Sequence, residues 1–144
     1  MKTEILDLSH LPAVSELEAL TFRHPWSETA LCHLLTGPNF GVVALDGDRV
    51  IAYVGLAAAL DEGEITNVAT HPAYRRRGAA RAVLLRLLDE AKARGLGRLT
   101  LEVRESNTAA QALYASLGFT PCGTRKGFYT NPHEDALILE KIIN

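Results

Sequence analysis

Residues 67–95 read NVATHPAYRRRGAARAVLLRLLDEAKARG, and they join a strand-like segment to a strongly periodic helix. Apolar residues recur at helical spacing over residues 78–94. The positions expected to face inward include Ala82, Leu85 and Leu88. Gly95 ends the pattern, because glycine tolerates the positive φ that often closes a helix. The stretch therefore predicts a strand, a turn with three consecutive arginines, and a helix in direct succession.

Strand-like and helix-like segments alternate on both sides of this stretch. Before it, a helix is expected to start near Ser9 and Pro12, and Ser27 is expected to cap a second helix over residues 28–35. The expected strands are residues 3–8, 40–45, 50–60, 64–70, 98–103, 119–129 and 134–143. A further helix is expected over residues 107–117. This order predicts a mixed sheet flanked by helices, an α/β (α+β) fold.

The length and composition bound the class of protein. The chain has 144 residues, 47% of them hydrophobic, which suits a single domain over residues 1–144 that buries a core without disulfides. No apolar run approaches the roughly 18 residues of a membrane span, and the N-terminus lacks the apolar stretch of a signal peptide. We therefore expect a cytoplasmic protein without a membrane partner. The histidines and cysteines lack ligand spacing, so no metal is expected.

Charge is unevenly distributed along the chain. Residues 1–72 contain three basic and ten acidic residues, whereas residues 73–144 contain twelve basic and seven acidic residues. This separation favours an anionic ligand for the second half and a cationic one for the first, although charged helix faces that segregate by chance would give the same pattern.

The arginine junction has the properties of an anion site. The first N–H groups of a helix lack intrahelical partners, and the helix dipole directs positive charge toward them. Gly78 and the small Ala79 and Ala80 allow close approach to that backbone. Phosphate-binding donors are supplied by Arg75, Arg76, Arg77 and Arg81. A pyrophosphate is the predicted ligand, and an ordinary exposed surface is the alternative.

Other phosphate and nucleic-acid sites fit the sequence less well. The G-x-x-x-x-G-K-[ST] loop of nucleotide triphosphatases is absent. The arginine cluster has no basic helix face beyond it and no interleaved aromatic residues, which disfavours direct nucleic-acid binding.

A carboxylate interrupts the strand expected at residues 98–103. Leu99, Leu101 and Val103 alternate onto one face, and Glu102 lies on the other. A carboxylate in the middle of a covered sheet is costly unless it reaches water, a partner or a substrate. Glu102 is therefore either paired with a nearby arginine or a candidate general base.

The arginine junction resembles the acetyl-CoA motif [Arg/Gln]-x-x-Gly-x-[Gly/Ala] of the GCN5-related N-acetyltransferase (GNAT) superfamily. Arg75, Gly78 and Ala80 match that motif. The likeness extends to HPWSE at 24–28, LEVRESNTAAQALYASLGF at 101–119 and FYTNPHEDALILEK at 128–141. These segments are most similar to the RimI-type members, which acetylate the N-terminal alanine of a small-subunit ribosomal protein.

The resemblance implies a fold, a cosubstrate and roles for residues. The fold would be a mixed, mostly antiparallel sheet of about seven strands flanked by about four helices. Acetyl-CoA would be the cosubstrate, with Glu102 as proton acceptor and Tyr114 as proton donor. The residues implied to contact the cofactor are Val68, Ala69, Thr70, Arg75, Arg76, Arg77, Gly78, Ala79, Ala80, Arg81 and Asn107. Ala80 stands where glycine is frequent, and Arg75 replaces the more usual glutamine of the subgroup.

The implied acceptor is a basic protein N-terminus, and Trp26 and Tyr129 are the substrate-binding candidates. Alternatively, Trp26 packs just before Ser27 to hold the start of the second helix. Its attraction is expected to come from the acidic residues Asp61, Glu62, Glu64, Glu134 and Asp135. An α-amino group suits this chemistry, because its reference pKa of about 7.7–8.0 lies well below that of lysine at about 10.4. A small amine, an internal lysine, and a non-catalytic CoA-binding module are the alternatives. A monomer or a weak homodimer is expected.

Overall fold

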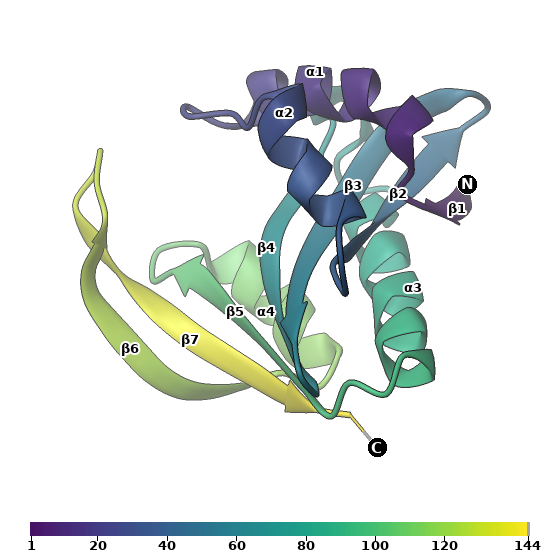
Figure 1. The fold of residues 1–144 in the computed structure, drawn as a ribbon. Helices are drawn as coiled ribbons and strands as arrows, with labels where there is room; N and C mark the ends of the chain where they lie inside the picture. Colours follow the sequence, from purple (N-terminus) through teal and green to yellow (C-terminus); the bar gives the residue numbers. More distant parts are fainter. Residues whose placement is uncertain (144) are drawn as a thin grey trace.

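The computed structural model describes residues 1–143 and contains one seven-stranded sheet in the order β1-β2-β3-β4-β5-β7-β6 (Figure 1). The strands are β1 Lys2–Ile5, β2 Phe40–Asp46, β3 Arg49–Ala59, β4 Glu62–Thr70, β5 Arg98–Arg104, β6 Thr120–Tyr129 and β7 Glu134–Ile142. Only β4 and β5 pair in parallel, and every other neighbouring pair is antiparallel. The mixed, mostly antiparallel sheet expected from the resemblance is confirmed.

Helices cover both faces of the sheet (Figure 1). They are α1 Leu11–Thr21, α2 Glu28–Leu31, α3 Ala79–Ala93 and α4 Thr108–Ser116, with short 3-10 turns at Leu8–His10, Cys32–Leu35 and Pro72–Tyr74. α1 and α2 bury Leu17 and Leu31 against one face, and α3 and α4 bury Leu87 and Tyr114 against the other. Two hydrophobic clusters therefore sandwich the sheet, and the basic junction lies where β4 passes into α3.

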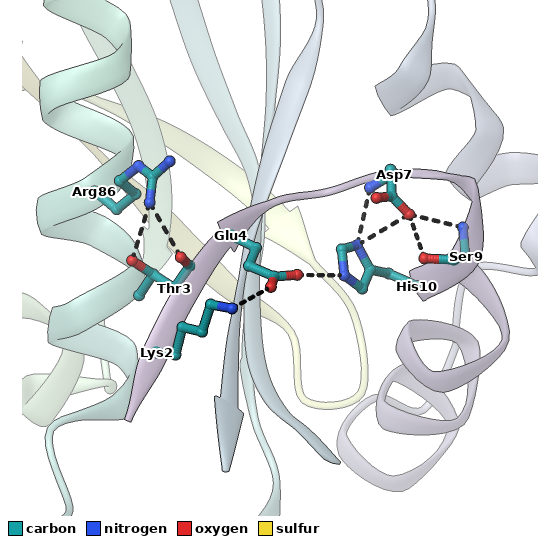
Figure 2. A network of polar contacts seen from close by, with 7 residues as sticks. All are labelled: Lys2, Thr3, Glu4, Asp7, Ser9, His10 and Arg86. Atoms are coloured by element: carbon teal, nitrogen blue, oxygen red, sulfur yellow. Dashed lines mark hydrogen bonds and ion pairs between the residues drawn. The ribbon is translucent and has the colours of Figure 1, made fainter. Parts of the chain in front are cut away.

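The N-terminal segment is fastened to its surroundings by polar contacts (Figure 2). Nε2 of the buried His10 lies 3.1 Å from Oε2 of Glu4, and its Nδ1 accepts the backbone N–H of Asp7 at 2.9 Å. Arg86 of α3 donates through Nη1 to the carbonyl oxygen of Thr3 at 3.1 Å. These contacts hold the edge strand β1 to the turn that precedes α1 and to α3.

The start of the first helix and the end of the second differ from the prediction. Asp7, rather than Ser9, caps the first turn, because its Oδ1 accepts the Ser9 backbone N–H at 2.8 Å. Ser27 does cap α2, since its Oγ accepts the Ala30 N–H at 3.1 Å. The helix expected over residues 28–35 tightens into a 3-10 turn after Leu31.

The β3–β4 hairpin also differs from the sequence prediction. Leu60 was expected in the strand, but it lies in the turn with φ 58° and is 99% exposed. Asp61–Gly63 was expected as the turn, yet β4 already starts at Glu62. Gly63 lies inside the strand, and the close packing there favours glycine, because a Cβ would stand 2.9 Å from a methyl carbon of Leu99.

The buried face of α3 is rotated from the one predicted. Ala79, Val83, Leu84, Leu87 and Ala91 are buried. Leu85 was expected inside but is 45% exposed, and Ala82 and Leu88 are only partly buried. Hydrophobic residues occupy more than half of this helix's circumference, so their spacing alone did not define which stripe faces the sheet.

The parallel junction of the sheet is short and opens into a split. β4 pairs with β5 only from Glu62–Ile65 to Arg98–Leu101. The register of β3 against β4 shifts at Thr66, which is an extra residue between the partners of Gly55 and Leu56. Such a bulge bends its strand, and β4 leaves β5 at this point. The two strands then diverge (Figure 1).

Candidate active site

A cleft of about 320 Å³ occupies the split between β4 and β5. This β4–β5 cleft is bordered by residues from α1, β4, β5, α4 and the end of β6. They include Phe22, Thr66, Asn67, Val68, Glu102, Arg104, Asn107, Tyr114 and Tyr129. The bulge and the short parallel junction thus bring both residues that the sequence analysis placed at the chemistry, Glu102 and Tyr114, to one cavity.

Glu102 lies at the cleft with one oxygen engaged. Its Oε1 is 3.2 Å from Nη1 of Arg125, and the side chain of Glu102 is 15% exposed while that of Arg125 is 55% exposed. Arg125 belongs to β6 and reaches across β7 to make this ion pair. Glu102 is therefore paired with an arginine and also borders the cleft, and its role as a general base stays a prediction.

Tyr114 is both a core residue and a wall of the cleft. Its ring meets that of Phe119 edge to face with centroids 6.0 Å apart, and the residue is only 7% exposed. Burial, with a smaller effect of Tyr129, raises the pKa of Tyr114 to about 12. The phenol therefore stays protonated at every pH near neutrality.

The β6–β7 hairpin is fixed over the cleft by Arg104. The Tyr129 ring lies 4.3 Å from the Arg104 guanidinium. Arg104 Nη1 donates to Oε1 of Glu134 at 3.0 Å, and Nη2 donates to the carbonyl oxygen of Thr130 at 3.2 Å. Tyr129 is the last residue of β6, where the strand expected over residues 119–129 also ends. Burial, and next the charge of Glu102, raise the pKa of Tyr129.

Two carboxylates of this hairpin, expected to attract a basic tail, serve internal contacts instead. Glu134 accepts hydrogen bonds from Arg104 and from both the backbone N–H and the hydroxyl of Ser106. Asp135 accepts the backbone N–H of Gly127 at 2.8 Å. Both groups are therefore part of the cleft's framework.

The part of β4 beyond the junction presents unpaired backbone to the split. The N–H of His71 donates to the carbonyl oxygen of Ile51 in β3 at 2.7 Å. Backbone groups of successive strand residues point to alternate sides, so Val68 and Thr70 direct theirs away from β3. Ala69 pairs with Tyr53 of β3 and is 2% exposed. The open donors and acceptors thus belong to Val68 and Thr70 rather than to Ala69.

A second cavity, of about 430 Å³, lies at the N-terminus of α3. Its walls include Thr70, Tyr74, Arg75, Arg76, Gly78, Ala79, Ala80, Arg81, Ala109 and Leu113. Gly78 has φ 78° and no side chain caps the helix. The first intrahelical bond runs from the Ala82 N–H to the Gly78 carbonyl oxygen at 2.9 Å, which leaves the preceding N–H groups unpaired. We call this cavity the anion pocket.

The arginines around the anion pocket are held in different ways. Arg77 does not border the pocket, because its guanidinium stacks 5.0 Å from the centre of the Tyr74 ring. Arg81 Nη1 donates to the hydroxyl of Ser116 in α4 at 2.8 Å. Arg76 adopts φ 64°. The structure brings Arg75, Arg76 and Arg81 together at the pocket and places Arg77 behind Tyr74.

Two further predicted residues have structural roles. Asn107 caps α4, because its Oδ1 accepts the Ala110 N–H at 3.1 Å, and it borders the β4–β5 cleft. Trp26 packs on the cluster beneath α1 and α2, and its backbone N–H donates to Oε1 of the buried Glu18 at 2.9 Å. Phe22, four residues earlier, is the aromatic residue of this region that borders the cleft.

The sequence analysis did not single out Phe22, Asn67, Arg104 or Arg125 as parts of the site. Asn67 alone carried a local signal, as a polar residue within an otherwise apolar strand end. Among residues 1–143, no group of three potential metal ligands is close enough to hold an ion. No helix in the same range has the length and apolar character needed to cross a membrane.

Comparison with known proteins identifies the family. Residues 5–119 match the Acetyltransferase (GNAT) family. The chain belongs to the GNAT acetyltransferases. The expected family is therefore confirmed, and its match includes the anion pocket, α4 and every residue named at the β4–β5 cleft except Tyr129. The GNAT motif residues Arg75, Gly78 and Ala80 all border the anion pocket.

Individual GNAT relatives cover nearly the whole chain. A ribosomal protein bS18-alanine N-acetyltransferase of Salmonella typhimurium is 38% identical over 137 residues, which is 94% of this chain and 93% of the relative. The crystal structure of the ribosomal-protein-S18-alanine N-acetyltransferase of Escherichia coli superposes with a TM-score of 0.91 at 35% identity, covering 99% of this chain and 95% of that one.

A more distant GNAT structure was determined with the cofactor. The phosphinothricin acetyltransferase of Sinorhizobium meliloti, in complex with acetyl-CoA, has a TM-score of 0.85 at 20% identity and covers 99% of this chain and 88% of that one. This likeness shows a shared fold. The family to which the chain belongs thus includes acetyl-CoA-bound members with the same architecture.

Proposed function

We propose that this GNAT enzyme transfers the acetyl group of acetyl-CoA directly to the N-terminal α-amino group of a protein, with the N-terminal alanine of ribosomal protein bS18 as the expected acceptor. The observation that carries the proposal is the arrangement of two cavities along β4. The anion pocket lies at Thr70 and the start of α3, and the β4–β5 cleft with Glu102 and Tyr114 begins at Val68. The anion pocket would hold one end of the long cofactor, and the β4–β5 cleft would hold its thioester beside the amine.

The cofactor's pyrophosphate would bind at the anion pocket. Unpaired N–H groups at the start of α3, together with Arg75, Arg76 and Arg81, supply donors and positive charge there. The pantetheine arm would then follow β4, where Val68 and Thr70 direct backbone groups into the split. A backbone N–H at Val68 would stabilise the thioester oxygen as it gains charge. Asn107 borders the same cleft and suits a polar contact to this arm.

Glu102 is the proposed proton acceptor. An amine attacks a thioester only as the free base, and an α-amino group with a reference pKa of about 7.7–8.0 gives up its proton readily. Oε1 of Glu102 is held by Arg125, so the other oxygen remains for the amine or for a water between them. The lone pair of the amine then attacks the acetyl carbonyl carbon, and the C–S bond breaks as the tetrahedral intermediate collapses.

Tyr114 is the proposed partner of the leaving thiolate. Its pKa of about 12 exceeds the reference thiol pKa of about 8.5 by roughly 3.5 units, which makes complete proton transfer to a free thiolate uphill by about 5 kcal/mol. A buried phenol with such a pKa is nevertheless a strong hydrogen-bond donor to an anion. Tyr114 therefore stabilises the sulfur by donating a hydrogen bond as charge develops.

The test is a comparison of acceptor peptides by mass spectrometry. One peptide carries a free N-terminal alanine followed by a basic residue, and the matched peptide has a blocked N-terminus and a single internal lysine. We expect faster acetylation of the first, with Glu102→Gln slowing it by roughly 10²–10⁴-fold. Equal rates would favour the lysine-modifying alternative. Cofactor binding without turnover on any amine would favour a CoA-binding module.

A further inference from the structure

A fully buried carboxylate lies behind the β4–β5 cleft and takes no part in the proposed transfer. Glu18 of α1 is 0% exposed. It accepts the Trp26 backbone N–H at 2.9 Å, Nδ2 of Asn67 at 3.0 Å, and the hydroxyl of Tyr53. Burial and the Glu18 contact raise the pKa of the Tyr53 phenol well above its usual range, which keeps this hydroxyl a donor. Three donors from three parts of the fold thus converge on Glu18.

This arrangement fixes the orientation of the Asn67 amide. An amide can in principle be turned by 180°, and its hydrogen-bond network decides the orientation. The reversed orientation of Asn67 would place an oxygen against the Glu18 carboxylate, so Nδ2 must face Glu18. Oδ1 is then directed elsewhere. It is buried, and it has no hydrogen-bond partner among residues 1–143.

An unpaired buried acceptor requires an explanation, because native proteins pair nearly all such groups. Among residues 1–143, Oδ1 of Asn67 is the one buried side-chain oxygen or nitrogen that lacks a partner. Asn67 also borders the β4–β5 cleft, together with Glu102. The acceptor that the fold leaves unsatisfied therefore belongs to a residue of the cleft wall.

We propose that Oδ1 of Asn67 accepts a hydrogen bond from the amino group of the acceptor substrate, and that Glu18 is the positioning residue that holds Asn67 for this contact. The inference rests on the proposed function. It assigns a second acceptor to the attacking nitrogen, beside Glu102. It also gives the buried Glu18 a role in substrate binding through Asn67.

The chemistry of the nitrogen makes two acceptors useful. An α-ammonium group has three N–H bonds, of which one is given up to Glu102 so that the lone pair can attack. A second N–H held by Asn67 restricts rotation of the amine and directs the lone pair toward the thioester.

The test compares two variants that remove one donor each from Glu18. Asn67→Ala removes the proposed substrate contact, whereas Tyr53→Phe removes a donor from the same carboxylate at a residue that does not border the cleft. We expect Asn67→Ala to lower kcat/KM for the alanine peptide by roughly 10-fold to 100-fold, the range for hydrogen bonds to charged groups. KM for acetyl-CoA should be unchanged, and Tyr53→Phe should lower Tm while leaving kcat/KM within about twofold.

A second comparison isolates the role of Glu18. Glu18→Gln should lower kcat/KM for the peptide, and this loss should disappear when the variant is made in the Asn67→Ala background, because Glu18 acts through Asn67. Asn67→Ser replaces Asn67→Ala if the latter does not fold.

Each outcome assigns a cause. If wild type acetylates the alanine peptide and Asn67→Ala does so with an unchanged kcat/KM, the inference is overturned and the proposed function is left intact. An equal loss of kcat/KM in Tyr53→Phe would also overturn it, because the network would then be structural only. If wild type acetylates lysine but not N-terminal peptides, the proposed function fails, and the same variant pair is compared on the lysine acceptor.

Discussion

Removal of the Arg125 guanidinium should slow the reaction through Glu102. Opposite unit charges about 4 Å apart attract by about 4 kcal/mol at an effective dielectric constant of about 20. Arg125 is 55% exposed and Glu102 15% exposed, with 3.2 Å between Nη1 and Oε1, so solvent screens the pair. Exposed pairs contribute about 0.2–1 kcal/mol, and the burial of Glu102 places this one near the upper limit. Arg125 also holds the Glu102 carboxylate in place, and we expect the loss of this positioning to outweigh any gain in basicity, so Arg125→Met should lower kcat/KM about fivefold.

The assay is kcat/KM for an N-terminal alanine peptide at saturating acetyl-CoA. Lys126→Met is the matched control, because it removes the same charge from the neighbouring position of β6, where no ion pair is formed within residues 1–143. The loss caused by Arg125→Met should vanish in a Glu102→Gln background. An equal effect of Lys126→Met, or additive effects of Arg125→Met and Glu102→Gln, would refute the reasoning.

Three further outcomes are expected. Tyr114→Phe should lower kcat by roughly 10²-fold or more. Because the pKa of Tyr114 is about 12, this deficit should stay constant between about pH 7 and 10 in a pH–rate profile. A deficit that fades within this range would argue against the donor role. Gly78→Val should weaken acetyl-CoA binding, measured by calorimetry, by roughly tenfold, or about 1.4 kcal/mol. Gly37→Val is the control, because Gly37 has a similar φ of 57° in open space, so the substitution should strain the backbone without changing the affinity for acetyl-CoA. Lys2 and His10 lower the pKa of Glu4, and Ser9 lowers the pKa of Asp7. The two carboxylates therefore contribute stability above their unfolded pKa values of about 4, and this contribution is lost as the pH falls through their folded pKa values. The Tm advantage of wild type over Asp7→Asn should disappear in thermal melts below about pH 3.

Local patterns in the sequence predicted most of the elements. The strand over residues 98–103 alternates strictly, and Leu99, Leu101 and Val103 are buried as expected while Glu102 turns to the other face. Gly95 follows α3 with φ 81°, and Ser27 caps α2. Each of these features depends on residues close in sequence, which is why the sequence alone was sufficient.

Features that depend on distant residues were missed or incomplete. The bulge at Thr66 arises from the register of β3 against β4, and it has no signature within β4 itself. The pairing of Glu102 with Arg125 crosses a whole strand, and the capture of Glu134 by Arg104 joins two segments thirty residues apart. The buried face of α3 was misjudged because several stripes of this helix are apolar, and only packing against the sheet selects one.

The short parallel junction has a mechanical consequence. The first four strands are joined to the last three by four residue pairs between β4 and β5, from Glu62–Arg98 to Ile65–Leu101. A strand advances about 3.3 Å per residue, so the end of β5 at Arg104 lies about 10 Å beyond the last pair. A rotation of roughly 10° at the junction would displace that end by nearly 2 Å, whereas about 1 Å of misplacement is enough to cost roughly a hundredfold in rate. A Cβ added at Gly63 would stand 2.9 Å from a methyl carbon of Leu99 across this junction, so a substitution there would shift the two strands and change catalysis without touching either substrate.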